Sequence, residues 1–74
     1  MRKEDLTGYL NRRPFQPFRI YLSTGSFLDI RQPELAHVSR STITIGQAIE
    51  GDQQRFIVIA LIHIVWLEIL VPAP

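Results

Sequence analysis

The chain has 74 residues, of which 46% are hydrophobic, and a net charge of +1, so it can hold one domain, 1–74, with a small core that oligomerisation often supplements. It contains no cysteine, which excludes disulfides and thiolate metal sites. Its start has basic residues but no apolar run of the signal-peptide type, so we expect a cytoplasmic protein.

Residues 5–13 predict a short N-terminal helix, because Leu6, Tyr9 and Leu10 fall at positions i, i+3 and i+4. Pro14 ends it, since the residue before a proline is disfavoured in the α conformation. A helix this short does not persist alone in water, so we expect it to lie on the rest of the domain.

Short strands fill the segment 18–70. Alternating apolar and polar residues predict a hairpin with its turn at Gly25. A bend is expected at Arg40-Ser41, and a loop at 46–53, which contains Gly51-Asp52. The expected strands are 18–22, 27–31, 36–39, 42–45, 54–60 and 64–70.

The last two strands come from residues 56–71, which read FIVIALIHIVWLEILV. A membrane helix needs about 20 apolar residues, and this stretch is shorter. Its many β-branched residues argue against a buried helix, and one unbroken strand would far exceed the usual 5–6 residues. We therefore divide it near 60–63, treat 71–74 as a tail, and expect no membrane association.

These elements predict a mainly β fold: a small β-barrel of about five or six short strands, preceded by one short N-terminal helix. Closure into a barrel would protect the many strand edges. Leu6 and Leu10 are expected to cap one end of the core. The strand residues predicted to be buried are Phe18, Ile20, Leu22, Leu28, Ile30, Val38, Ile43, Ile45, Val58, Val65, Leu67 and Ile69.

Several short motifs are spread along the chain. They are Arg13-Pro14-Phe15-Gln16-Pro17-Phe18-Arg19, Gly25, Pro33-Glu34-Leu35, Leu61-Ile62-His63-Ile64 and Glu68. Together they resemble a family of short uncharacterised bacterial proteins that share an RPFxPF opening, a glycine turn, a PEL and a late LLHI. The resemblance covers nearly the whole chain and implies a family without implying an activity.

The order of elements is the helix, Ile20-Tyr21-Leu22, the turn with Gly25, and a terminal pair of strands. This order is similar to the Sm-like fold, which includes the Hfq-like small β-barrels, so the resemblance implies a small Sm-like or SH3-like β-barrel. That family builds rings that bind RNA. This chain has Ile30 in place of a glycine of the family and Ala60-Leu61 in place of a Lys-His pair of Hfq, so the resemblance implies the fold without that RNA site.

The parity of the last strand predicts a candidate interface. If Val65, Leu67 and Ile69 point inward, then Ile64, Trp66 and Glu68 point outward. An exposed tryptophan beside an isoleucine forms an apolar patch, and tryptophan is enriched at the centres of interfaces. We therefore expect a homo-oligomer or a small protein partner, with edge-to-edge pairing of the last strands.

Nucleic acid is the alternative partner, contacted by Arg12, Arg13 and Arg19. Residues 1–20 carry a net charge of +3 and residues 41–74 a net charge of −2. This asymmetry is far weaker than the basic footprint typical of nucleic-acid binders. The more ordinary role of Arg12 and Arg13 is to complement the helix C-terminus.

No catalytic or metal site is expected. Glu34 and His37 have the i, i+3 spacing of metal-binding helices, but a stable site usually needs three or four ligands. His63 has no nucleophile or orienting carboxylate at a recognisable spacing. The sequence therefore predicts a non-enzymatic interaction and assembly module without cofactor, metal or small-molecule substrate.

Overall fold

The computed structural model describes residues 1–71 and is mainly β with one N-terminal helix, as predicted. Apart from Val71, the expected tail lies outside the described residues. Within 1–71, no helix is long and apolar enough to cross a membrane. The elements are α1 (Lys3–Leu10), β1 (Phe18–Leu22), β2 (Phe27–Ile30), η1 (Pro33–Leu35), β3 (Ala36–Val38), β4 (Thr42–Glu50), β5 (Gln53–Ala60), η2 (Leu61–His63) and β6 (Ile64–Ile69).

Compared with the expected range 5–13, helix α1 begins two residues earlier and ends three residues earlier. Asn11 donates its backbone N–H to the Thr7 carbonyl and closes the last turn. The Arg13 guanidinium then donates to the Leu10 carbonyl, one of the acceptors that a helix end leaves without a backbone partner. Arg12 and Arg13 therefore belong to the connection between α1 and β1.

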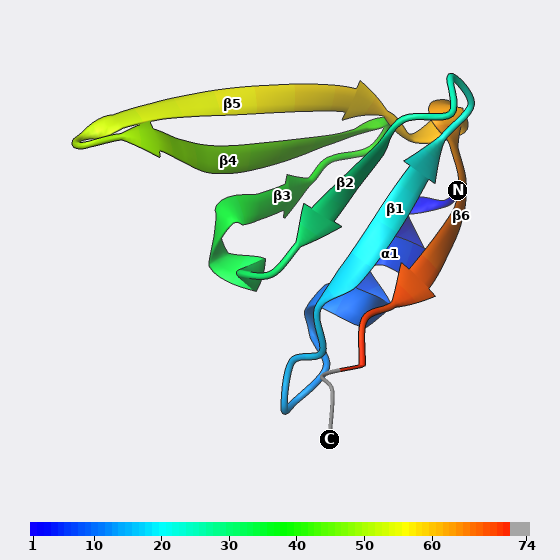
Figure 1. The fold of residues 1–74 in the computed structure, drawn as a ribbon. Helices are drawn as coiled ribbons and strands as arrows, with labels where there is room; N and C mark the ends of the chain where they lie inside the picture. Colours follow the sequence, from blue (N-terminus) through cyan, green and yellow to red (C-terminus); the bar gives the residue numbers. More distant parts are fainter. Residues whose placement is uncertain (72–74) are drawn as a thin grey trace.

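The strands form two antiparallel sheets, sheet I in the order β2-β1-β6 and sheet II in the order β3-β4-β5 (Figure 1). Helix η1 separates β2 from β3, helix η2 separates β5 from β6, and neither of these strand pairs forms a ladder. The sheets therefore do not close into the expected barrel. In the part of the chain that the structure describes, β2, β3, β5 and β6 are edge strands with a partner on one side only.

Two of the tight turns are as predicted. Gly25, in the turn between β1 and β2, has a φ of 92°, a left-handed conformation that glycine adopts without steric cost. The turn between β3 and β4 lies at Arg40-Ser41, where the Ser39 N–H donates to the Thr42 carbonyl at 2.8 Å.

The β4–β5 hairpin is longer than predicted, because the expected loop at 46–53 is mostly strand. The two residues Gly51-Asp52 alone reverse the chain, because Gly51 has a φ of 57° at the first central position of a two-residue hairpin loop. Strand β3 pairs only with Ile43–Ile45, so residues 46–56 form a two-stranded ribbon, here called the arm. Figure 1 shows the arm extending well beyond the other elements.

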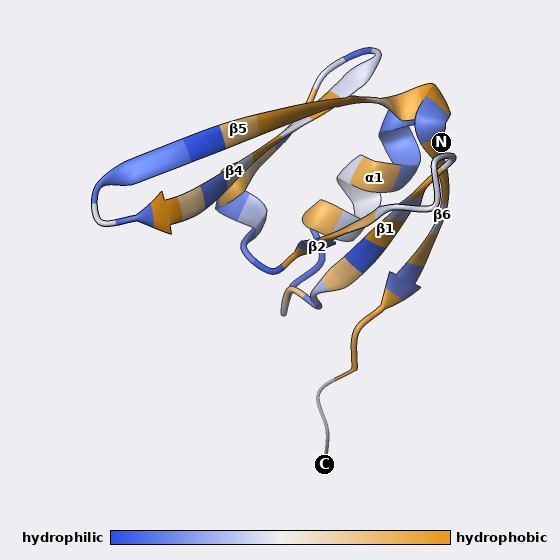
Figure 2. Cartoon of the chain, turned by 45° about the horizontal axis from the view of Figure 1, so that its top comes forward, coloured by the Kyte–Doolittle hydropathy of each residue, from blue (hydrophilic) through white to orange (hydrophobic). Residues whose placement is uncertain are grey.

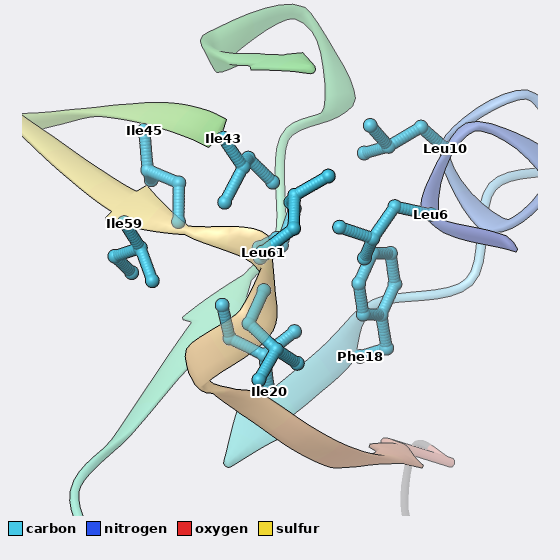
Figure 3. Packing of buried hydrophobic residues seen from close by; sticks show 10 residues of the cluster. Leu6, Leu10, Phe18, Ile20, Ile43, Ile45, Ile59 and Leu61 are labelled. Carbon is cyan, nitrogen blue, oxygen red and sulfur yellow. The ribbon is translucent and has the colours of Figure 1, made fainter. Parts of the chain in front are cut away.

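The core lies between α1 and the two sheets. Figure 3 shows Leu61 between a group from sheet II, which includes Ile43 and Ile59, and a group from α1 and β1, which includes Leu6 and Phe18. The predicted core residues Leu22, Leu28, Val38, Leu67 and Ile69 are only partly buried and pack around this cluster. The buried hydrophobic side chains are Leu6, Leu10, Phe18, Ile20, Ile30, Ile43, Ile45, Ile59, Leu61 and Ile64.

The predicted burial of Val58 is wrong, because its side chain is 63% exposed. Ile43 pairs with Ile59, and Ile45 pairs with Ile57. Residues directly opposite one another point to the same face of a sheet, so inward Ile43 and Ile45 require Ile57 and Ile59 to face inward as well. Val58 must then face outward.

The predicted facing of Ile64 and Val65 is also wrong. Ile64 is 3% exposed and Val65 is 56% exposed. Tyr21 pairs with Trp66 whereas Leu22 pairs with Ile64, so the register shifts and Val65 is an extra residue on β6. Such a β-bulge lets Ile64 point inward while Val65 and Trp66 both point outward.

Candidate self-association surface

Three aromatic side chains form a row on the outward face of sheet I. Phe27, Tyr21 and Trp66 lie opposite one another on adjacent strands. The Tyr21 and Trp66 rings stack with centroids 3.7 Å apart and planes 9° apart, and the Phe27 centroid lies 5.9 Å from that of Tyr21. Because Tyr21 covers one face of the indole, the other face points past the edge of the sheet.

A neighbouring row of charged groups orients the aromatic rings. Arg19 donates from Nε and Nη2 to the two carboxylate oxygens of Asp29, at 2.6 and 3.2 Å, and its guanidinium lies 4.1 Å from the Phe27 centroid. The Arg19 hydrogen bonds hold the pKa of Asp29 below its usual value, and Asp29 in turn raises the pKa of Arg19. Tyr21 donates its hydroxyl to Glu68 Oε1 at 2.9 Å.

Two strand edges carry exposed apolar side chains beside backbone that has no strand partner within residues 1–71. At the β6 edge, Val65 is 56% and Trp66 is 51% exposed, and at the β5 edge Phe56 is 67% and Val58 is 63% exposed. Figure 2 shows that the hydrophobic part of β5 is the half next to η2, whereas its half near the hairpin turn is hydrophilic. The two apolar edges therefore adjoin η2, which joins β5 to β6.

The three residues predicted for the interface do not share one face. Trp66 and Glu68 are exposed as expected, whereas Ile64 is buried in the core because of the bulge at Val65. Sequence reasoning missed Phe56 and placed Val58 on the wrong side. One feature of the sequence could have indicated that both side chains are exposed: β5 contains more apolar residues than its one buried face can hold.

The three arginines proposed for nucleic-acid contact are not brought together. The Arg12 guanidinium lies 4.7 Å from the Tyr9 centroid, and Arg13 donates to the carbonyls of Leu10 and Arg12. Both follow α1, which packs on the inner side of β1 through Leu6 and Leu10. Arg19 points to the opposite side of β1, since it alternates with the buried Phe18 and Ile20.

His63 forms a contact that the sequence did not indicate. Its Nδ1 lies 3.2 Å from the Ser23 hydroxyl, because Ser23 donates its backbone N–H to the His63 carbonyl where sheet I ends. Both side chains are exposed, and no carboxylate orients the imidazole in any hydrogen bond of residues 1–71. Over the same residues, no three His, Cys, Asp or Glu side chains are grouped to hold a metal ion.

No family model, curated protein or solved structure matches the chain. Two features of the surface described above indicate its function. One is the stacked aromatic row that ends at the β6 edge, and the other is the apolar edge of β5.

Proposed function

We propose that this chain is a non-enzymatic, cytoplasmic assembly module that associates with copies of itself through a contact containing Trp66. The observation that carries this proposal is a half-exposed Trp66 on a strand edge that has no partner in the described part of the chain. Tryptophan is enriched among the residues that dominate interface energies. An apolar strand edge is in addition a template for pairing with another chain.

The β5 edge is the complementary surface on the second copy. Phe56 and Val58 stand beside it, so pairing β6 of one copy with β5 of the next covers both apolar edges. Pairing β6 with β6 would leave the β5 edge in water. A contact between two different surfaces is heterologous, and it generates a closed ring or an open filament.

The arm supports the same arrangement. An isolated two-stranded ribbon is marginally stable in water, whereas three or more strands with an apolar face can be stable. A strand from a second copy, placed along β5, would give the arm a third strand. It would also cover Phe56, whose ring lies against Gly46 and contributes little to the core.

An Sm-like nucleic-acid binder that uses Arg12, Arg13 and Arg19 is the second candidate. Its support is the net charge of +3 in residues 1–20. Arg19 already makes a bidentate ion pair with Asp29, and this ion pair competes with any contact between Arg19 and a phosphate group. We therefore rank self-association first.

Light scattering coupled to size exclusion at micromolar concentration tests the proposal. The wild type should be larger than a monomer, and Trp66→Ser should shift the population toward the monomer. Loss of a dominant interface tryptophan costs about 2 kcal/mol or more, which corresponds to roughly thirtyfold weaker association. Phe27→Ser is the matched control, because Phe27 is equally exposed in the same aromatic row but on β2.

A proline variant tests the second edge. The Leu61 N–H donates to the Ser41 carbonyl, and alternation along the ladder then directs the Val58 N–H away from β4. Val58→Pro removes that outward donor without removing a β4–β5 hydrogen bond, so it should also produce monomers. A monomeric wild type, or an oligomer that both substitutions leave unchanged, would remove the proposal.

The same preparation distinguishes the second candidate. Nucleic acid that co-purifies at low salt and dissociates at high salt would raise the ratio of absorbance at the nucleic-acid and protein maxima. We expect a ratio typical of protein alone.

A further inference from the structure

A cleft of about 500 Å³ lies where the two sheets separate, away from the β5 and β6 edges. Its walls are residues 27–32, which include β2, and residues 45–48 of β4, with Leu35 between them. Consecutive residues line both walls. Since side chains alternate between the faces of a strand, such lining means that the cleft runs along the backbone edges of β2 and β4.

The β2 wall presents unpaired backbone groups. The Leu22 N–H donates to the Ser26 carbonyl at 2.8 Å, and this bond sets the alternation of the β1–β2 ladder. Leu28 and Ile30 then direct their N–H and C=O groups toward β1. Phe27 and Asp29 direct theirs into the cleft, where β2 has no strand partner among the described residues.

The β4 wall is unpaired for a different reason. Strand β3 pairs with β4 only as far as Ile45, because Pro33–Leu35 form η1 and turn the chain away. Beyond Gly46, β4 therefore has no partner on that side among residues 1–71. Thr44 pairs with Val58 at a position where the Thr44 N–H points away from β5. Ala48 lies four residues further along β4, so its N–H points to the same side, into the cleft.

We propose that this cleft binds an extended peptide segment of another protein, which adds as a strand along β2 and β4. Main-chain hydrogen bonds supply affinity in this mode of recognition, and alternate side chains supply specificity. The site is separate from the self-association edges, so it does not depend on the proposed function.

Charge and burial define the chemistry of the peptide. Its inward side chains would contact Leu28, Leu35 and Ile45, so they are apolar. Its outward side chains would pass Arg31, whose side chain is 64% exposed and 3.4 Å from Asp29. Asp29 is already paired with Arg19, so Arg31 is the exposed cation on the rim of the cleft. The peptide is therefore one in which apolar and acidic residues alternate.

Titration of the isotope-labelled full chain followed by amide NMR tests the proposal. The probe is a capped synthetic peptide that alternates valine with glutamate, and the matched control alternates valine with lysine. The glutamate peptide should bind saturably and at least about tenfold more tightly, with the amides of Phe27, Asp29 and Ala48 shifted and slower to exchange. Arg31→Glu should reverse this preference.

Two proline variants locate the binding. Ala48→Pro removes the N–H that points into the cleft and should weaken binding at least about tenfold, whereas Val58→Pro should bind as the wild type does. Circular dichroism confirms that each variant folds, and the charge reversal at Arg31 provides an independent readout if Ala48→Pro does not. No saturable shift, shifts confined to β5 and β6, or cleft amides protected by a second copy in the free protein would each overturn the proposal.

Discussion

Truncation of Ile20 to alanine should be among the most destabilising single changes in the chain. Ile20 is 0% exposed and lies on the central strand of sheet I. The change removes three carbons at about 0.8 kcal/mol each, or about 2.4 kcal/mol of transfer free energy. The cavity left behind raises the expected loss to about 2–5 kcal/mol. A domain of this size has about 4–11 kcal/mol of stability in total, so the variant should be largely unfolded in moderate urea.

Urea unfolding followed by circular dichroism measures this loss at one protein concentration, because association would shift the apparent stability. With a slope of about 1 kcal/mol/M, the midpoint should fall by about 2 M or more. Val65→Ala is the control: Val65 is 56% exposed on the bulge, so its truncation should cost within about 0.5 kcal/mol. Ile20→Val, expected to cost about 0.5–1.5 kcal/mol, remains measurable if the alanine variant does not fold. Equal losses for Ile20→Ala and Val65→Ala would refute the assigned facing of β1 and β6.

Asp29→Asn should destabilise the protein near neutral pH, and the difference from the wild type should shrink in acid. Arg19 lowers the pKa of Asp29 from 3.8. The stabilisation that charged Asp29 gives the fold is therefore complete above pH 3.8 and is lost as the pH falls through the folded-state pKa. Urea midpoints measured across this pH range check the sign. Gly25→Ala should destabilise by about 1–2 kcal/mol because the φ of Gly25 is 92°. Gly8→Ala should stabilise by about 0.5–1 kcal/mol, since an added Cβ would meet no atom of the described residues within 4 Å apart from its chain neighbours and the adjacent backbone of α1. The melting temperatures of both glycine variants report these effects.

Features decided within a few residues could be predicted from the sequence. The β1–β2 hairpin follows from the alternation around Ile20 and from a glycine at the turn. The division of 56–71 into two strands follows from its length, and η2 lies where the division was expected. The exposure of Trp66 was predicted as well, although the parity used to predict it misplaced Val65.

Features that depend on pairing between distant residues could not be predicted. Gly51-Asp52 indicates a turn, but a two-residue turn and the tip of a long loop have the same local signal. Whether residues 46–50 become strand depends on their partners in β5. The cleft between β2 and β4 arises in the same way, because η1 ends the β3 pairing at Ile45.

By itself the sequence determined the mainly β class, the single N-terminal helix and the position of the turns, because periodicity and turn chemistry are local properties. Only the tertiary structure decided which faces of β5 and β6 are buried. Residues 56–60 of β5 and 64–67 of β6 are apolar on both faces of their strands, so alternation there does not indicate which face is buried. The pairing of Ile43 with Ile59 decides the facing of β5. The extra residue Val65 decides the facing at the start of β6, because an inserted residue reverses the facing of the residues on one side of the bulge.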